Sequence, residues 1–250
     1  MNLLASRKSW LLSPVVFALS VLALLGIWAV MDPETLCTAF DHDGRSFVEV
    51  LTLPFYALIV PTVWLACPFG GSFKRKILLC LAVSCVAVMA VCKELDLHIA
   101  FLSSVYPDTV ANFRGTPFKM RFLTRGGIPA GAKLMVVSYF VLFFGVFAAL
   151  FAAYAVRFVK GVFKLHPVAW TMGCFGASGV MVQLCDRVPA WYRHTIGAGR
   201  YLPPAAQSCF TALEEGGEMM IAAFALIAIL QAHELYGTGG DKYPVNADAL

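Results

Sequence analysis

Residues 10–31, WLLSPVVFALSVLALLGIWAVM, decide the fold, because these 22 positions contain no charged side chain. Roughly 20 apolar residues in a helix are enough to cross the hydrocarbon core of a bilayer. Working outward from this segment, the chain contains five further long apolar segments, at 46–67, 77–98, 134–156, 167–185 and 204–233. The sequence therefore predicts an all-α fold, a polytopic membrane helix bundle of about six transmembrane helices.

The composition agrees with a membrane protein and argues against several other classes. Hydrophobic residues make up 60% of the 250-residue chain and charged residues 14%, whereas soluble proteins have about 45–50% and about 25%. The apolar runs are continuous, which argues against an alternating transmembrane barrel. A net charge of +4 is too small to indicate nucleic-acid binding, and the eight cysteines include no C-x-x-C pair for zinc or dithiol chemistry.

The basic residues predict the orientation of the bundle. The N-terminal segment and the loops after the second and fourth spans contain eight basic residues and no acidic one. A six-span topology places all three on one side, which the positive-inside rule makes cytoplasmic. We therefore expect a single membrane domain over residues 1–250 with both termini in the cytoplasm, a long outer loop at 99–133 and a loose tail at 234–250.

The acidic residues gather on the side opposite to these basic segments. In the six-span topology, 12 of the 15 Asp and Glu residues lie there. Nine of them come from four helix ends, at residues 41–49, 93–98, 186–187 and 214–218. A charged side chain at membrane depth costs about 2.5–3.5 kcal/mol on insertion scales and usually faces a bundle interior or a wet cavity. We therefore expect a cluster of ionisable groups near the outer leaflet.

The spacing of the acids requires a compensating group. Glu94 and His98 are four residues apart, as are Glu214 and Glu218, so each pair would share one face of a continuous helix. Two carboxylates at that spacing repel each other unless a metal ion, a shared proton or a basic partner lies between them.

Three interpretations of this cluster remain open. In the first, four side chains bind a divalent metal such as zinc: Glu94, His98, Glu214 and Glu218. Their spacing departs from the Glu-x-x-His of di-iron bundles. In the second, the acids form a path for protons or a cation. In the third, basic residues pair with the acids in a structural network: Lys93, Arg187, and Arg45 with Glu49.

A basic and aromatic segment precedes the fourth span. In residues 113–122, FRGTPFKMRF, basic side chains alternate with apolar ones, which suits a segment at the membrane interface with its bases near lipid phosphates. Lys119, Arg121 and Arg125 are the candidate phosphate ligands. The alternative is an ordered loop whose bases are simply solvated.

Small residues suggest two further features. Three glycines on one span predict close helix approach: Gly173, Gly176 and Gly179. Four cysteines fall near the outer face: Cys37, Cys92, Cys185 and Cys209. A disulfide such as Cys37–Cys209 is one option in an oxidising compartment, while packing as small apolar side chains is the more common role.

Two short motifs carry a family resemblance. The sequence KELDLH at residues 93–98, with FKMRF at 118–122, resembles a group of uncharacterised bacterial multi-pass inner-membrane proteins. That group has a basic-Glu-x-Asp-x-His motif at a helix end and a Glu-Glu-x-x-x-Glu-like last span. Here the latter reads LEEGGE at residues 213–218 and departs by one residue. The resemblance implies a bacterial inner-membrane location and a joint role for the acids and His98, and it carries over no activity.

From these features we expect a membrane-embedded, metal-dependent hydrolase of a lipid or lipid-linked substrate. A metal-bound water would attack the substrate, with Glu215 or Asp96 as general base. The expected partners are the bilayer and this substrate. A non-catalytic scaffold and a proton- or cation-coupled transporter are the alternatives, and the lack of an evident inverted repeat argues against a secondary transporter.

Labelling of single introduced cysteines tests the predicted topology. We expect positions in 74–76 and the position of Lys160 to react only from the cytoplasm, because basic loops stay inside. Positions in 41–43 and the position of Arg121 should react only from outside. Finding Arg121 and Lys160 on the same side would contradict the six-span topology.

Overall fold

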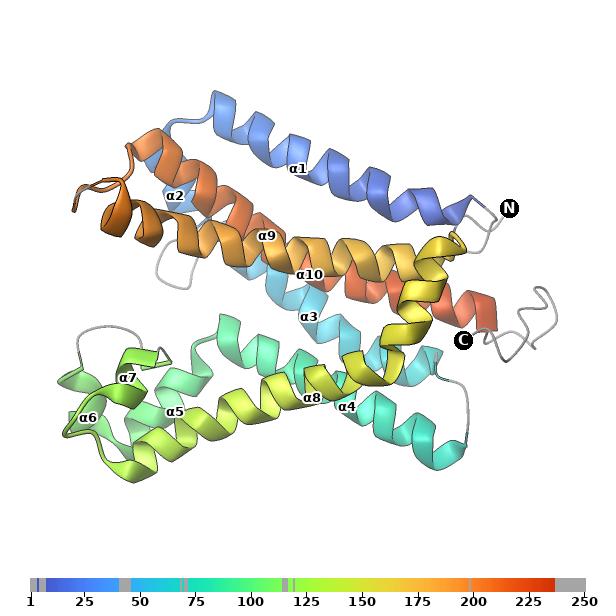
Figure 1. The fold of residues 1–250 in the computed structure, drawn as a ribbon, viewed down its shortest axis with the longest axis horizontal. Coiled ribbons are helices and arrows are strands. Elements are labelled where there is room, and N and C mark those ends of the chain that lie inside the picture. Colours follow the sequence, from blue (N-terminus) through green and yellow to red (C-terminus); the bar gives the residue numbers. More distant parts are fainter. Residues whose placement is uncertain are drawn as a thin grey trace.

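The computed structural model is a bundle of long helices with short helices at one end (Figure 1). It describes residues 4, 8–40, 46–67, 69, 72–113, 117–118, 120–197 and 199–236. The helices are η1 (Ser9–Leu11), α1 (Leu12–Val30), α2 (Pro33–Phe40), α3 (Phe47–Ala66), α4 (Phe73–Glu94), α5 (Leu97–Val105), α6 (Pro107–Ala111), α7 (Met120–Thr124), α8 (Ala130–Phe163), α9 (Pro167–Thr195) and α10 (Pro204–Tyr236). No strand occurs in the described part of the chain, so the predicted all-α fold is confirmed.

Six long helices run along the bundle and alternate in direction (Figure 1): α1, α3, α4, α8, α9 and α10. In the described residues, five helices are long and apolar enough to cross a membrane, namely η1 with α1, and α3, α4, α8 and α9. The remaining long helix, α10, has 33 residues and carries the three acids of the LEEGGE motif. The long helices overlap the predicted spans but differ at some ends: α8 extends beyond 134–156 at both ends, α9 continues past residue 185 to Thr195, and α4 lies four residues earlier than 77–98.

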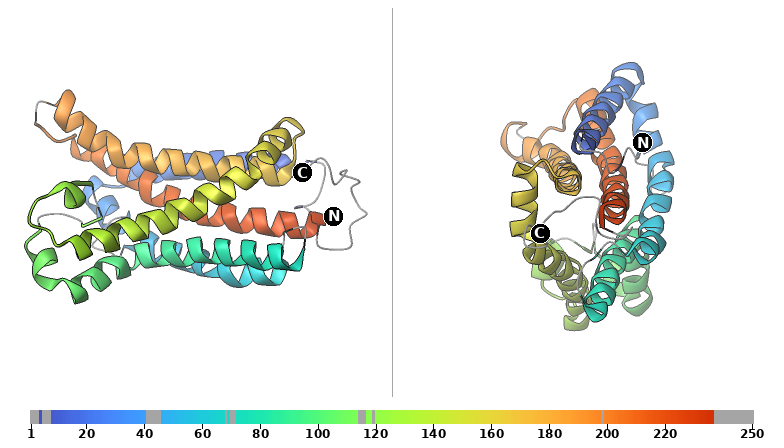
Figure 2. Two further views of the ribbon diagram at one scale, coloured as in Figure 1. Left: turned by 60° about the horizontal axis from the view of Figure 1, so that its bottom comes forward. Right: turned by 90° about the vertical axis from the view of Figure 1, so that its right-hand side faces the viewer.

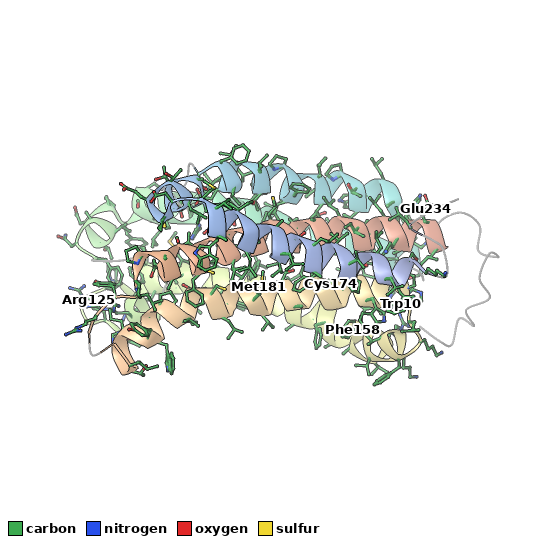
Figure 3. The ribbon with its side chains drawn as sticks, turned by 90° about the horizontal axis from the view of Figure 1, so that it is seen from above. Trp10, Arg125, Phe158, Cys174, Met181 and Glu234 are labelled. Carbon is green, nitrogen blue, oxygen red and sulfur yellow. The ribbon has the colours of Figure 1, made fainter. Side chains whose placement is uncertain are left out.

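The two ends of the bundle carry different elements. Figure 3 shows Trp10, Phe158 and Glu234 at one end and Arg125 at the other. We name the first the basic end, because Lys8, Lys74, Lys76, Lys160 and Lys164 lie at the helix ends found there. We name the opposite end, which carries α2, α5, α6 and α7, the far end.

The long helices pack as a closed ring. Helix α10 packs on α9 and α3, α3 packs on α4, α4 packs on α8, and α8 packs on α9. Helices α1 and α2 cover the ring from outside, where they contact α10 and its neighbours α9 and α3. The view along the long axis shows this arrangement (Figure 2). Because α3 separates α4 from α10, a side chain that joins these two helices has to reach across the ring.

The segment at 99–133, expected to be a long loop, contains short helices around a small core. Helices α5, α6 and α7 surround Phe122, which is fully buried, and Leu102 and Phe113 pack into the same cluster. Val136 of α8 completes it. Burial of these large apolar side chains stabilises the segment as a folded cap on the start of α8.

The third span ends earlier than predicted. Helix α4 ends at Glu94, and Asp96 has a φ of 50°, in the left-handed region. A left-handed residue cannot continue an α-helix, so α5 is a separate helix. The prediction that Glu94 and His98 share one face of a continuous helix is therefore wrong.

Glycine permits the closest helix contacts at two positions of α10. An added Cβ would lie 2.6 Å from Leu24 Cδ1 at Gly216 and 2.6 Å from Val182 Cγ2 at Gly217. Helices α1 and α9 therefore pack against the backbone of α10 itself. The three glycines predicted for this role have nothing within 4 Å of an added Cβ, so that prediction is wrong for all of them: Gly173, Gly176 and Gly179.

The substitution Gly217→Ala should destabilise the protein. The new methyl group would overlap Val182, and overpacking of this kind costs about 1–3 kcal/mol. The matched control is Gly179→Ala on α9, where the added Cβ meets open space and the better helix propensity of alanine stabilises by up to about 1 kcal/mol. Thermal unfolding in detergent measures both, and equal melting temperatures would contradict the close approach of α9 and α10.

Candidate functional site

The candidate site is centred on Lys93, in the last turn of α4. Its Nζ donates to the two carboxylate oxygens of Glu218 on α10, at 2.5 and 2.6 Å, and to Glu94 Oε1 at 3.3 Å. The side chain of Glu94 is 5% exposed and that of Glu218 is 13% exposed. Lys93 therefore acts as the basic partner that the carboxylates require, and it joins α4 to α10 across the ring.

Two tyrosines hold the neighbouring backbone in place. The Tyr56 hydroxyl of α3 donates to the backbone oxygen of Glu218 at 3.3 Å. The Tyr139 hydroxyl of α8 donates to the backbone oxygen of Met89 at 3.1 Å, one turn before Lys93. Four of the five ring helices thus contribute a polar group to the site.

The other acids of α10 point in different directions. The Glu215 carboxyl interacts electrostatically with Glu218, Lys93 and Glu94, which places it beside the ion pair. Glu214 interacts electrostatically with the Cys185 thiol of α9. Successive helical residues are separated by about 100°, so the two adjacent acids face different neighbours.

Negative charge is in excess at this site. One ammonium group faces the carboxyls of Glu94, Glu215 and Glu218. If all of them were ionised, the site would carry two uncompensated negative charges. Such charge is costly at membrane depth, so the site has the capacity to take up a proton or a small cation.

The site lies between the two ends of the membrane-spanning helices. Gly216, next to Glu215, packs against Leu24, and α1 continues from there to Val30. At 1.5 Å per residue, Leu24 lies about 9 Å short of that end of α1. Lys93 lies about 25 Å along α4 from Lys76 by the same measure. The carboxylates are therefore within the span of α1, on the side of the far end.

His98 does not join the carboxylates. Its Nδ1 lies 3.1 Å from the backbone oxygen of Cys92, and its ring stacks on Tyr139 at 5.4 Å and meets the edge of Phe118 at 4.3 Å between centroids. Across the described ranges, no three His, Cys, Asp or Glu side chains form a group that could hold a metal ion. The expected metal ligands are thus brought together only in part, because Glu94 and Glu218 meet through Lys93 while His98 and Glu214 have other neighbours.

The remaining predicted site residues lie outside this cluster or outside the described residues. Asp96 is exposed, and its left-handed backbone is a conformation that a short polar side chain tolerates. Arg121 is exposed on α7, and the Arg125 guanidinium lies over the Phe113 ring at 5.6 Å. Lys119 lies outside the described residues, so the structure does not place the three expected phosphate ligands together.

The other described residues of the predicted ion-pair network interact with residues close to them in sequence. Arg187 Nε pairs with its neighbour Asp186 at 3.3 Å, and both side chains are exposed. Glu49 belongs to a capping box at the start of α3, where its Oε2 accepts from the Ser46 N–H at 2.8 Å. Residues 41–45, which include Arg45, are outside the described ranges. No disulfide joins any of the eight cysteines, all of which lie in the described residues.

The sequence indicated Lys93 as one basic partner, but it did not indicate the roles of the two tyrosines or of the α10 glycines. A Ser-x-x-Glu signature at 46–49 was readable as a cap, and it accounts for Glu49. Tyr56 and Tyr139 carry no local signal, because their partners are distant in sequence. Comparison of the chain with protein-family models, with curated proteins and with solved structures gave no match.

A double-mutant cycle measures the Lys93–Glu218 interaction. Lys93→Met and Glu218→Gln should each lower the free energy of unfolding by on the order of 2 kcal/mol. This is less than the about 3–5 kcal/mol for breaking a fully buried pair, because the Lys93 side chain is 52% exposed. The double variant should lose less than the sum of the two. Lys74→Met, on an exposed position of α4, is the control, and strictly additive losses would contradict the ion pair.

Proposed function

We propose that this integral membrane protein passes protons or a small monovalent cation across the bilayer, with the Lys93–Glu218 ion pair as the exchange site. The observation that carries the proposal is an ion pair with excess carboxyls, reaching across a ring of long helices at membrane depth. Ionisable groups in such positions commonly mark ion and proton pathways. The bilayer environment itself follows from the five long apolar helices of the described residues.

The exchange works through competition for the carboxyls. While the site is empty, the ammonium group neutralises Glu218. A proton or cation that binds Glu218 removes the attraction that holds Lys93, which at 4 Å and an effective dielectric constant of 20 amounts to about 4 kcal/mol. Glu94 and Glu215 are the adjacent carboxyls that can receive or supply the proton. The half-exposed side chain of Lys93 has room to move away.

A second cluster of polar side chains lies further along α10, toward the basic end. Ser13, Thr171 and Gln231 form a buried hydrogen-bonded chain, with Oγ–Oγ1 at 2.5 Å and Oγ1–Oε1 at 2.6 Å. Within the described residues the Gln231 amide Nε2 has no hydrogen-bond partner. A buried donor without a hydrogen-bond partner costs about 1–3 kcal/mol. This cost favours the binding of a polar molecule or ion beside Gln231.

The proposal includes the orientation expected from the sequence, with the basic end in the cytoplasm of a bacterial cell and the exchange site toward the outer leaflet. The expected metal-dependent hydrolase has no support from the side-chain geometry, because Lys93 occupies the position between the carboxylates. The scaffold alternative keeps one specific observation in its favour, since Lys93–Glu218 also fastens α4 to α10.

Proton flux into liposomes tests the function. Purified protein is reconstituted in vesicles that contain potassium and a pH-sensitive dye, and valinomycin then sets an inside-negative potential. We expect internal acidification that Glu218→Gln reduces at least about tenfold, the scale of a general proton-transfer group. Asp186→Asn, which removes an exposed ion pair, should leave the flux unchanged.

The same vesicles distinguish the transported ion. Acidification without uptake of radioactive sodium assigns the proton, and sodium uptake without acidification assigns the cation. If the folded protein gives neither flux, or if Glu218→Gln transports as fast as the wild type, the proposal is wrong and the ion pair is a structural clamp.

A further inference from the structure

Two cysteine thiols meet at the basic end, where α3 and α4 pack against each other. Cys67 directly follows the last residue of α3, and Cys80 lies early in α4. The two thiols interact electrostatically and through a side-chain hydrogen bond. A thiol is both a weak donor and a weak acceptor, so the two groups suit each other as partners. The sulfur atoms of two neighbouring helices are thus brought together.

A backbone carbonyl of α3 fixes this arrangement. The oxygen of Val63 accepts from the Cys67 N–H at 3.0 Å and from the Cys80 thiol at 3.6 Å. The backbone oxygen of Ala66, next to Cys67, accepts from His233 Nδ1 of α10 at 2.7 Å. The end of α3 is therefore held by side chains from both α4 and α10, and the two cysteines share one acceptor.

The two thiols differ in their access to solvent. Cys67 is exposed, whereas Cys80 is 1% exposed. Cys67 begins the connection between the two helices, and the first turn of α4 after this connection carries Lys74 and Arg75. Basic residues of this kind mark the end of a membrane span, so Cys67 lies where water-soluble reagents reach the chain. Redox-active cysteines are commonly accessible and adjacent to a second, resolving cysteine, and this pair has both properties.

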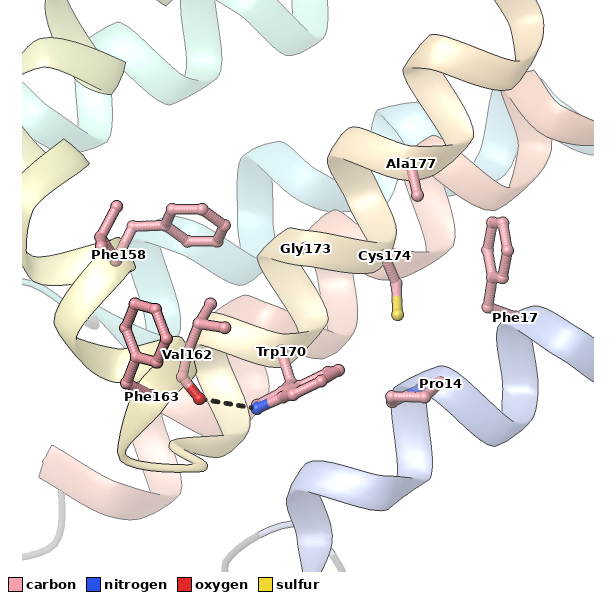
Figure 4. A pocket seen from close by; sticks show the side chains of 10 residues that line it. Pro14, Phe17, Phe158, Val162, Phe163, Trp170, Gly173, Cys174 and Ala177 are labelled. Atoms are coloured by element: carbon pink, nitrogen blue, oxygen red, sulfur yellow. Dashed lines mark hydrogen bonds between the residues drawn. The ribbon is translucent and has the colours of Figure 1, made fainter.

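Other thiols have neighbours that suit simple packing. Figure 4 shows Cys174 among the apolar lining residues of a pocket between α1, α8 and α9. Cys85, further along α4 than Cys80, donates to the sulfur of Met89 at 4.0 Å. Cysteine in such surroundings behaves as a small apolar side chain. Cys85 therefore provides a matched control on the same helix as Cys80.

We propose that Cys67 and Cys80 form a reversible disulfide when a hydroperoxide oxidises them. With hydrogen peroxide, the Cys67 thiolate attacks one oxygen, the O–O bond breaks, and the other oxygen leaves as hydroxide, which takes up the thiol proton to give water. Cys80 then loses its proton, attacks the sulfenic sulfur of Cys67 and displaces hydroxide, which this proton converts to a second water. Two thiols and one peroxide thus give one disulfide and two waters. The bond joins α3 to α4 at the basic end and is independent of the proposed transport.

Peptide mapping of the oxidised protein tests this disulfide. The purified full chain is treated with hydrogen peroxide in detergent, its remaining thiols are blocked with N-ethylmaleimide, and trypsin then cleaves at 74–76, between the two cysteines. We expect mass spectrometry to find peptide 46–74, whose only cysteine is Cys67, joined to peptide 77–93. Dithiothreitol should separate the two peptides.

Alanine variants identify the partner, because peptide 77–93 contains Cys80, Cys85 and Cys92. Cys80→Ala should lose the joined peptides and leave Cys67 as a sulfenic acid that dimedone traps, whereas Cys85→Ala should keep them. Cys67→Ser, at an exposed position, should lose them with an unchanged melting temperature. Joined peptides that persist in Cys80→Ala, or that are absent from the oxidised wild type, would overturn the proposal.

Discussion

The arrangement of the helices depends on one ammonium group among several carboxyls at membrane depth. A carboxylate in hydrocarbon needs a partner, and the partner of Glu218 comes from a helix that α3 separates from its own. Lys93 can reach across only if α3, α4 and α10 keep their register. The hydroxyl of Tyr56, which binds the backbone at Glu218, fixes α3 in this relation. The ion pair thus connects α4 to α10 across the ring.

The LEEGGE segment combines two requirements in six residues. Its acids supply carboxyls to the ion pair and to the α9 side, while Gly216 and Gly217 let Leu24 and Val182 pack directly on the α10 backbone. Small residues at helix contacts increase dispersion contacts, which drive association where the hydrophobic effect is absent. Close packing on one face and charge on the other therefore meet at the same turn of α10. We therefore expect substitutions in this turn to destabilise the fold.

The helices were predictable from sequence because the thickness of hydrocarbon fixes their length. The residues at which the helices end, and the helices that pack against each other, were less predictable. Asp96 breaks α4 through its backbone conformation, which the apolar pattern does not encode. The segment at 99–133 folds because Phe113 and Phe122 are buried together, although their alternation with arginine suggested a lipid surface. Lys93 was one of several candidate partners, and its choice of Glu218 depends on the ring order of the helices, which a single sequence does not specify.

Solid-state NMR on the protein in bilayers measures the central contact directly. With ¹⁵N-lysine and ¹³Cδ-glutamate labels, the Lys93 Nζ should show dipolar dephasing by a carboxyl carbon about 3–4 Å away, the geometry of a charge-assisted pair. We expect this dephasing to persist in Glu94→Gln and to fall strongly in Glu218→Gln, where only the more distant Glu94 carboxyl, with its Oε1 3.3 Å from Nζ, remains. Strong dephasing of Lys93 that survives Glu218→Gln, or none in the wild type, would contradict the ion pair on which the fold and the proposed transport depend.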